Sequence, residues 1–197
     1  NESILLDTGV GIGLDQLPEA QPSGVDTSYI EQKWMDIPYA NFSDAQKMDI
    51  YLPNTGSGPF PVIIFIHGGG FALGDKGGQG LSDALSALNR SYAVASINYR
   101  LSGEAKFPAQ INDVKAAIKF IRAHADAYNL DPNKIAVWGG SAGGNLAALA
   151  GTSGDVPELT NVSFGYDNTS DKAQAVIDWF GPINFLTMDD QFHESGI

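Results

Sequence analysis

Hydrophobic and polar residues alternate in two stretches, KWMDIPYA at residues 33–40 and QKMDIYLP at residues 46–53. Alternation with a period of two residues is typical of strands that bury one face and expose the other. The two stretches are separated by only a few residues. We therefore expect them to pair as an antiparallel hairpin or at an edge of a sheet.

The pattern then changes to short, continuous apolar runs, which are typical of parallel strands covered on both faces. Between them, residues 108–129 show a helical period, with one apolar stripe and NLDP at its end. Strands alternating with helices predict an α/β fold with a mostly parallel sheet and helices on both faces. The stripe consists of Ile111, Val114, Ile118 and Ile121, and the runs are PVIIFIHG (61–68), YAVASINY (92–99), KIAVWG (134–139) and AVIDWF (175–180).

Residues 1–30 lack periodicity and are expected to form an arm or cap segment, whereas residues 31–197 read as part of one domain. Hydrophobic residues make up 43% of the chain and charged residues 17%, which is an ordinary globular balance. A net charge of −12 argues against nucleic acid or an anionic membrane as partner. The absence of cysteine excludes disulfides and a thiolate nucleophile. No apolar run approaches the roughly 20 residues of a membrane span, and the compartment stays open.

Two glycine-rich loops directly follow apolar runs, HGGGF at residues 67–71 and GGSAGG at residues 139–144. Ligands of open α/β sheets bind beyond the carboxyl ends of the strands, so both loops should open onto one edge. In G-x-S-x-G the serine sits on a strained strand-to-helix turn, where Gly139 and Gly143 would remove steric clashes. The helix that follows directs its free N–H groups toward a developing negative charge. The alternatives are a serine helix cap for GGSAGG and a phosphate-type loop for HGGG.

These loops, together with NYRLS, QINDVKAAIKFIRAHA, DPNKIAVWGGSAGGNLAAL and VIDWFGP, resemble the hormone-sensitive-lipase-like α/β-hydrolases over residues 34–185. Among these, the chain is most similar to bacterial esterases described as acetylxylan or feruloyl esterases. The resemblance implies that Ser141 is the nucleophile and that the N–H groups of Gly69, Gly70 and Ala142 form the oxyanion hole. It implies short-acyl or aromatic ester substrates, with plant polysaccharide as one source, and neither cofactor nor metal.

In this fold the triad continues after the serine with an acid and then a histidine, each after a later strand. Only one strand pattern, at residues 175–180, follows Ser141. We therefore expect this chain to be the amino-terminal portion of the hydrolase domain, without its carboxyl-terminal strands. A continuation or a second polypeptide would carry the acid and the histidine. His193, with Asp189 and Asp190 close to it in sequence, is disfavoured as the base.

Other polar residues near the apolar runs are expected to support the fold. His67 and Gly68 would anchor the loop that carries the oxyanion donors. Arg100 and Asp113 would form a buried ion pair that fixes the loop after NY. His124 lies at the end of the predicted helix, where a structural role is expected, and Phe71 is a candidate for the acyl pocket.

Two rival motifs occur near the start of the chain. LLDTGVG resembles the aspartic-protease loop at Asp7, but those proteases are β proteins with two such loops. GVGIG lacks the preceding strand of a dinucleotide site. Two rival functions on the same fold also stay open, a serine peptidase and a non-catalytic receptor that has lost its histidine.

Overall fold

A computed structural model describes residues 24–78, 80–154, 156–161 and 164–188, together with residues 190 and 193. The DTG and GVGIG motifs lie outside the described residues, as do Asp189 and most of the expected arm. Among the described helices, none is long and apolar enough to cross a membrane.

One six-stranded sheet organises the described chain, in the order β1-β2-β4-β3-β5-β6. β1 and β2 form the predicted antiparallel hairpin, and β2 also runs antiparallel to β4. β4, β3, β5 and β6 are mutually parallel, which confirms the mostly parallel sheet. The strands are β1 (Lys33–Pro38), β2 (Lys47–Tyr51), β3 (Phe60–Ile66), β4 (Ala93–Ile97), β5 (Leu130–Gly140) and β6 (Ala175–Trp179).

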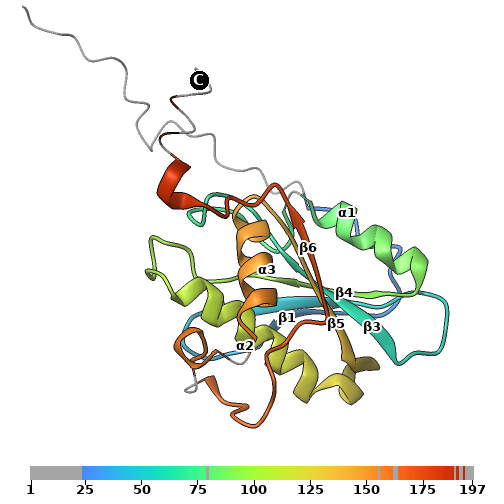
Figure 1. Cartoon of the computed structure of the whole chain (residues 1–197). Helices are drawn as coiled ribbons and strands as arrows, with labels where there is room; N and C mark the ends of the chain where they lie inside the picture. Colours follow the sequence, from blue (N-terminus) through green and yellow to red (C-terminus); the bar gives the residue numbers. More distant parts are fainter. Residues whose placement is uncertain are drawn as a thin grey trace, which may run out of the picture.

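Helices cover the sheet from both sides, α1 on one face and α2 with α3 on the other (Figure 1). The alternation along β3 explains this arrangement, because Val62 and Ile64 pack in the cluster with α2 and α3, whereas Ile63 and Phe65 pack with α1. The helices are α1 (Leu81–Leu85), α2 (Ala109–Ala123) and α3 (Ala142–Thr152), and 3-10 turns occupy Ser86–Arg90, Ala125–Tyr128, Pro157–Leu159 and Phe185–Thr187.

The long helical pattern forms α2, and all four residues of its predicted stripe are fully buried. The α-helix ends at Ala123 and a 3-10 turn follows it. Asn129 then takes a left-handed conformation, and β5 begins at Leu130. Most of the NLDP segment therefore starts the strand rather than merely ending the helix.

Unlike the other three apolar runs, β6 is not covered on both faces, as expected for a sheet without its carboxyl-terminal strands. Its pairing with β5 makes it the last strand at that edge of the described sheet. Val176 is 41% exposed and Trp179 is 43% exposed. Within the described chain, nothing pairs with its outer edge. Exposed apolar side chains continue after the strand at Phe180, Ile183, Phe185, Leu186 and Met188.

Candidate active site

Ser141 lies on the turn that joins β5 to α3, with backbone angles φ 55° and ψ −122°. Residues other than glycine rarely adopt a positive φ, so the backbone of Ser141 is strained in this turn. The side chain is partly exposed, and its hydroxyl has no hydrogen-bond partner among the described residues. The fold thus presents an unengaged hydroxyl at the carboxyl edge of the sheet.

Glycines make this serine turn (residues 139–144) possible because the backbone segments pass very close to one another. A Cβ atom on Gly139 would lie 2.2 Å from the carbonyl carbon of Gly143. A Cβ atom on Gly143 would lie 2.1 Å from the carbonyl oxygen of Ile66. Neither position has room for a side chain, in agreement with the steric argument from the sequence.

The glycine loop (residues 67–71) follows β3, the strand that pairs with β5, and Ile66 is in register with Gly139. A Cβ atom on Gly68 would lie 3.5 Å from the Cβ atom of Ser141, so the loop and the serine turn are in contact. A Cβ atom on Gly70 would meet nothing within 4 Å, so this part of the loop faces open space. The parallel pairing therefore brings together the two loops predicted to share an edge.

Three backbone N–H groups of the glycine loop and the serine turn are unpaired. Those of Gly69, Gly70 and Ala142 have no hydrogen-bond partner in the described part of the chain. Ala142 opens α3, where helix geometry leaves the first N–H groups unpaired. These are the three groups that the family resemblance implies for the oxyanion hole, and none of them is engaged within the described residues.

His67 is buried beneath the glycine loop. Its ring stacks on Tyr99 with 4.4 Å between the ring centroids, and its Nδ1 lies 2.7 Å from the carbonyl oxygen of Gly68. The Tyr99 hydroxyl donates to the carbonyl oxygen of His67 at 3.0 Å. Burial lowers the pKa of His67, so the ring is neutral and Nδ1–H can donate to Gly68. These contacts suit His67 to hold the glycine loop in place.

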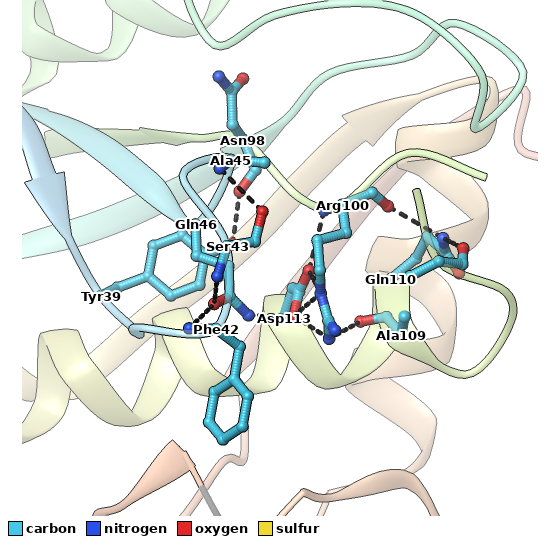
Figure 2. A network of polar contacts seen from close by, with 11 residues as sticks. Tyr39, Phe42, Ser43, Ala45, Gln46, Asn98, Arg100, Ala109, Gln110 and Asp113 are labelled. Atoms are coloured by element: carbon cyan, nitrogen blue, oxygen red, sulfur yellow. Dashed lines mark hydrogen bonds and ion pairs between the residues drawn. The ribbon is translucent and has the colours of Figure 1, made fainter. Parts of the chain in front are cut away.

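An ion pair between Arg100 and Asp113 anchors the start of the loop after β4 (Figure 2). The Nη2 and Nε atoms of Arg100 donate to the two carboxylate oxygens at 2.7 and 2.9 Å. Gln46 and the Arg100 main chain also donate to this fully buried carboxylate, at 2.7 and 2.9 Å. Further along the same loop, Ser102 N–H donates to the carbonyl oxygen of Phe71 at 2.7 Å. The ion pair expected from the sequence is thus present, and its loop contacts the glycine loop.

Phe71 connects the glycine loop with the segment that follows β6. Its backbone is left-handed, at φ 61°, and its partly exposed ring lies 6.4 Å from that of Phe185. Phe185 is itself half exposed. The end of the glycine loop and the segment after β6 are therefore in aromatic contact.

Three polar contacts behind the serine turn were not anticipated from the sequence. Asn145 Nδ2 donates to the carbonyl oxygen of Pro182 at 2.7 Å, and Gly181 N–H donates to Asp178 Oδ1 at 2.8 Å. Ser141 N–H donates to the carbonyl oxygen of Trp179 at 2.9 Å. The one available signal was Asp178, a carboxylate inside an apolar run.

The described residues bring no base to the serine. No histidine or carboxylate hydrogen-bonds to Ser141 in the described part of the chain. His193 is exposed. His124 Nδ1 lies 2.9 Å from the carbonyl oxygen of Phe120, at the end of α2. Among these residues, no group of three His, Cys, Asp or Glu side chains could hold a metal ion.

Comparison with known proteins places this geometry in a family. The family model described as BD-FAE matches residues 48–196, which is most of the chain. The chain belongs to the BD-FAE family. A bifunctional GH43-CE structure from Bacteroides eggerthii is 42% identical, with a TM-score of 0.76, over 80% of this chain and 22% of that one. A truncated carbohydrate esterase from gut microbiota is 35% identical, also with a TM-score of 0.76, over 85% of this chain and 62% of that one.

Relatives with curated names are ester hydrolases. A probable carboxylic ester hydrolase of Mycobacterium tuberculosis, LipM, is 33% identical over 80% of this BD-FAE chain and 36% of its own length. A probable isoprenylcysteine alpha-carbonyl methylesterase of Arabidopsis thaliana is 32% identical over 77% of this chain and 31% of its own. The chain thus spans about a third of the length of these relatives. The shared architecture is the α/β-hydrolase fold.

Proposed function

We propose that this chain carries the nucleophile and the oxyanion hole of a carboxylic-ester hydrolase, with Ser141 as the nucleophile. One observation carries the proposal: the strained Ser141 has an unpaired hydroxyl, its turn contacts the glycine loop, and three N–H groups of that loop and turn are unpaired within the described residues. A helix cap would engage the serine hydroxyl with the helix N–H groups. No such cap hydrogen bond forms at the start of α3.

In the proposed reaction, Ser141 Oγ attacks the ester carbonyl carbon and gives its proton to a base. Negative charge develops on the carbonyl oxygen, where the N–H groups of Gly69, Gly70 and Ala142 would stabilise it. Each such donor contributes about 10²- to 10³-fold in rate. The intermediate collapses to an acyl-serine, and the leaving alcohol takes up the proton. Water then attacks the acyl-serine and releases the acid.

The base and its orienting acid would come from outside the described residues, on a continuation of this polypeptide or on a second one. Two observations support this proposal. The outer edge of β6 and the apolar segment after it are exposed, and such surfaces are normally covered. The ester hydrolase relatives are about three times as long as the region they share with this chain.

For the substrate, we propose short-acyl or aromatic esters, including those on polysaccharides. The structural relatives named as carbohydrate esterases support this choice. A tannase structure from Fusobacterium nucleatum, at 27% identity and a TM-score of 0.62, points to aromatic esters. The neighbouring rings of Phe71 and Phe185 suit an aromatic acyl group.

The test uses the natural polypeptide that contains this sequence, and intact-mass spectrometry first establishes its length. p-Nitrophenyl acetate hydrolysis should fall by about 10⁴-fold or more in Ser141→Ala, and a fluorophosphonate should label Ser141. Ser102→Ala, an exposed serine on a neighbouring loop, is the matched control and should keep its activity. Equal hydrolysis by Ser141→Ala would refute the proposal. A wild-type protein that binds esters without cleaving them would favour the receptor alternative.

A further inference from the structure

Lys76 lies a few residues beyond the glycine loop and is buried against the β1–β2 hairpin. Its ammonium group lies 2.8 Å from Asp49 Oδ2 and 2.9 Å from Asp36 Oδ1. Asp49 is itself buried in the middle of β2, and its other oxygen accepts a hydrogen bond from Asp36 N–H at 2.7 Å. Burial disfavours the ammonium, but these hydrogen bonds outweigh it and raise the pKa of Lys76. The lysine is therefore held charged between two carboxylates.

The main chain around Lys76 is fixed to β4 as well. Lys76 N–H donates to Asn98 Oδ1, and the Ser96 hydroxyl donates to the Lys76 carbonyl oxygen at 2.6 Å. Asn98 Nδ2 also donates to Asp75 Oδ2 at 2.8 Å. The side chain of this residue is thus held by β1 and β2, and its backbone is held by β4 and the residue that follows it.

This anchor reaches the oxyanion donors because the chain doubles back between residues 67 and 76. A Cβ atom on Gly74 would lie 2.4 Å from His67 Nδ1. A Cβ atom on Gly69 would lie 2.1 Å from the carbonyl oxygen of Leu73, and Leu73 N–H donates to the carbonyl oxygen of Gly69. The segment of residues 72–76, here called the return segment, therefore packs directly on the glycine loop. Moving the return segment would move Gly69 and Gly70.

We propose that Lys76, through Asp49 and Asp36, is a positioning residue that holds the return segment and so fixes the N–H groups of Gly69 and Gly70. The inference rests on the proposed function, because only a reaction at Ser141 gives those N–H groups a role. It goes beyond that function by assigning the precise placement of the oxyanion donors to an ion cluster with the β1–β2 hairpin. Lys76 does not touch the substrate in this proposal.

The first experiment measures the loop itself and does not depend on catalysis. Hydrogen–deuterium exchange is compared between the wild-type natural polypeptide and Lys76→Met. Exchange should become faster in peptides covering residues 67–76 and stay unchanged in α3. The matched control is Lys115→Met. Lys115 is buried even more deeply than Lys76 and pairs with Asp171 at 3.5 Å, at the far end of α3 from Ser141. The Lys115→Met variant should have a lower melting temperature than the wild type, with unchanged hydrogen–deuterium exchange at residues 67–76.

The second experiment measures ester hydrolysis by the folded variants. Lys76→Met should lower kcat by about ten- to a hundredfold with KM within about threefold, because the donors act mainly on the transition state. A boronic acid that mimics the tetrahedral intermediate should lose affinity by a similar factor. Lys115→Met should keep kcat.

A double variant tests the inference in case Lys76→Met does not fold. Lys76→Met leaves Asp49 buried without its cation, so the double variant Lys76→Gln with Asp49→Asn removes both charges and keeps hydrogen-bonding groups. It should show the same direction of change in exchange and kcat. Unchanged exchange at residues 67–76, or unchanged kcat with only a lower melting temperature, would overturn the inference. Inactivity of the wild type, or full activity of Ser141→Ala, would instead overturn the proposed function.

Discussion

The main-chain N–H of Ser141 donates a hydrogen bond of 2.9 Å to the carbonyl oxygen of Trp179. The strained turn is thus fastened to the end of β6, and the segment after β6 packs against the start of α3. A Cβ atom on Gly181 would lie 2.5 Å from both Asn145 N and Asp178 Oδ1. The position of Ser141 therefore depends on Gly181, which lies outside the serine turn.

Gly181→Ala should push this segment away from α3 and misplace Ser141. We expect kcat to fall by about tenfold or more, because small displacements of a nucleophile are costly. The readout is the steady-state rate of p-nitrophenyl acetate hydrolysis. Gly103→Ala is the control, since a Cβ atom there would meet nothing within 4 Å. Equal rates for the two variants would contradict the prediction.

Replacing the strained serine by glycine should stabilise the protein while abolishing activity. Relief of the backbone strain at φ 55° and ψ −122° contributes about 1–3 kcal/mol, against about 0.5–1 kcal/mol of extra chain entropy. Ser141→Gly should therefore unfold in urea with a free energy about 1 kcal/mol above that of Ser141→Ala. Ser141→Ala keeps a Cβ atom and with it the strain. A glycine variant no more stable than the alanine variant would show that the turn stores no strain.

Breaking the Arg100–Asp113 pair should cost much more than breaking a surface pair. Arg100→Met leaves a fully buried carboxylate without its cation, which typically costs about 3–5 kcal/mol. Adding Asp113→Asn should restore part of the loss, because the charge is gone while an oxygen acceptor stays. The control is Lys134→Met, from an ion pair whose lysine is 69% exposed, with an expected loss below about 1 kcal/mol. Urea unfolding measures all four proteins, and equal losses for Arg100 and Lys134 would count against a buried anchor.

The neutral state of His67 predicts a pH dependence of stability. Burial lowers its pKa in the folded state, so the unfolded chain binds a proton at this residue first. The contribution of His67 to stability is complete above its ordinary pKa of about 6.5 and is lost as the pH falls toward the folded value. His67→Phe should keep the stacking on Tyr99 and lack this loss. The free energy of unfolding of the wild type should drop faster below pH 6.5, by up to about 1.4 kcal/mol per pH unit, and parallel profiles would refute the assignment.

Local patterns predicted much of the fold because they depend on neighbouring residues. Alternation gave the β1–β2 hairpin, and the helical period gave α2 with Ile111 and Val114 buried. The place of β2 beside β4 could not be read in this way, since it depends on pairing between distant segments. The exposure of Val176 on β6 likewise depends on what lies next to the strand rather than on its own apolar sequence.

The candidate site also combines local features, which the sequence reveals, with contacts between distant segments, which it does not. The need for glycine at Gly139 follows from local geometry, because a Cβ atom there would meet Gly143, whereas Gly143 needs to be glycine because β3 lies against it. The contacts that hold the site come from far along the chain, such as Trp179 to Ser141 and Asp49 to Lys76. A carboxylate inside an apolar strand was the visible sign of Asp49, but the sequence does not say which cation reaches it.

β3 and β5 pair in parallel, with Ile66 opposite Gly139. This register sets the distance between the glycine loop and the serine turn, and the packing of the hydrophobic core sets the register. A slip of one residue would shift the glycine loop by about 3.3 Å relative to the serine turn. The same slip would turn Val62 and Ile64 toward the wrong layer of helices, so it is rejected on grounds of burial alone. Substitutions that keep the apolar alternation along these strands therefore leave the spacing of the two loops untouched. The spacing of the two loops is thus fixed by buried apolar side chains that do not contact the substrate.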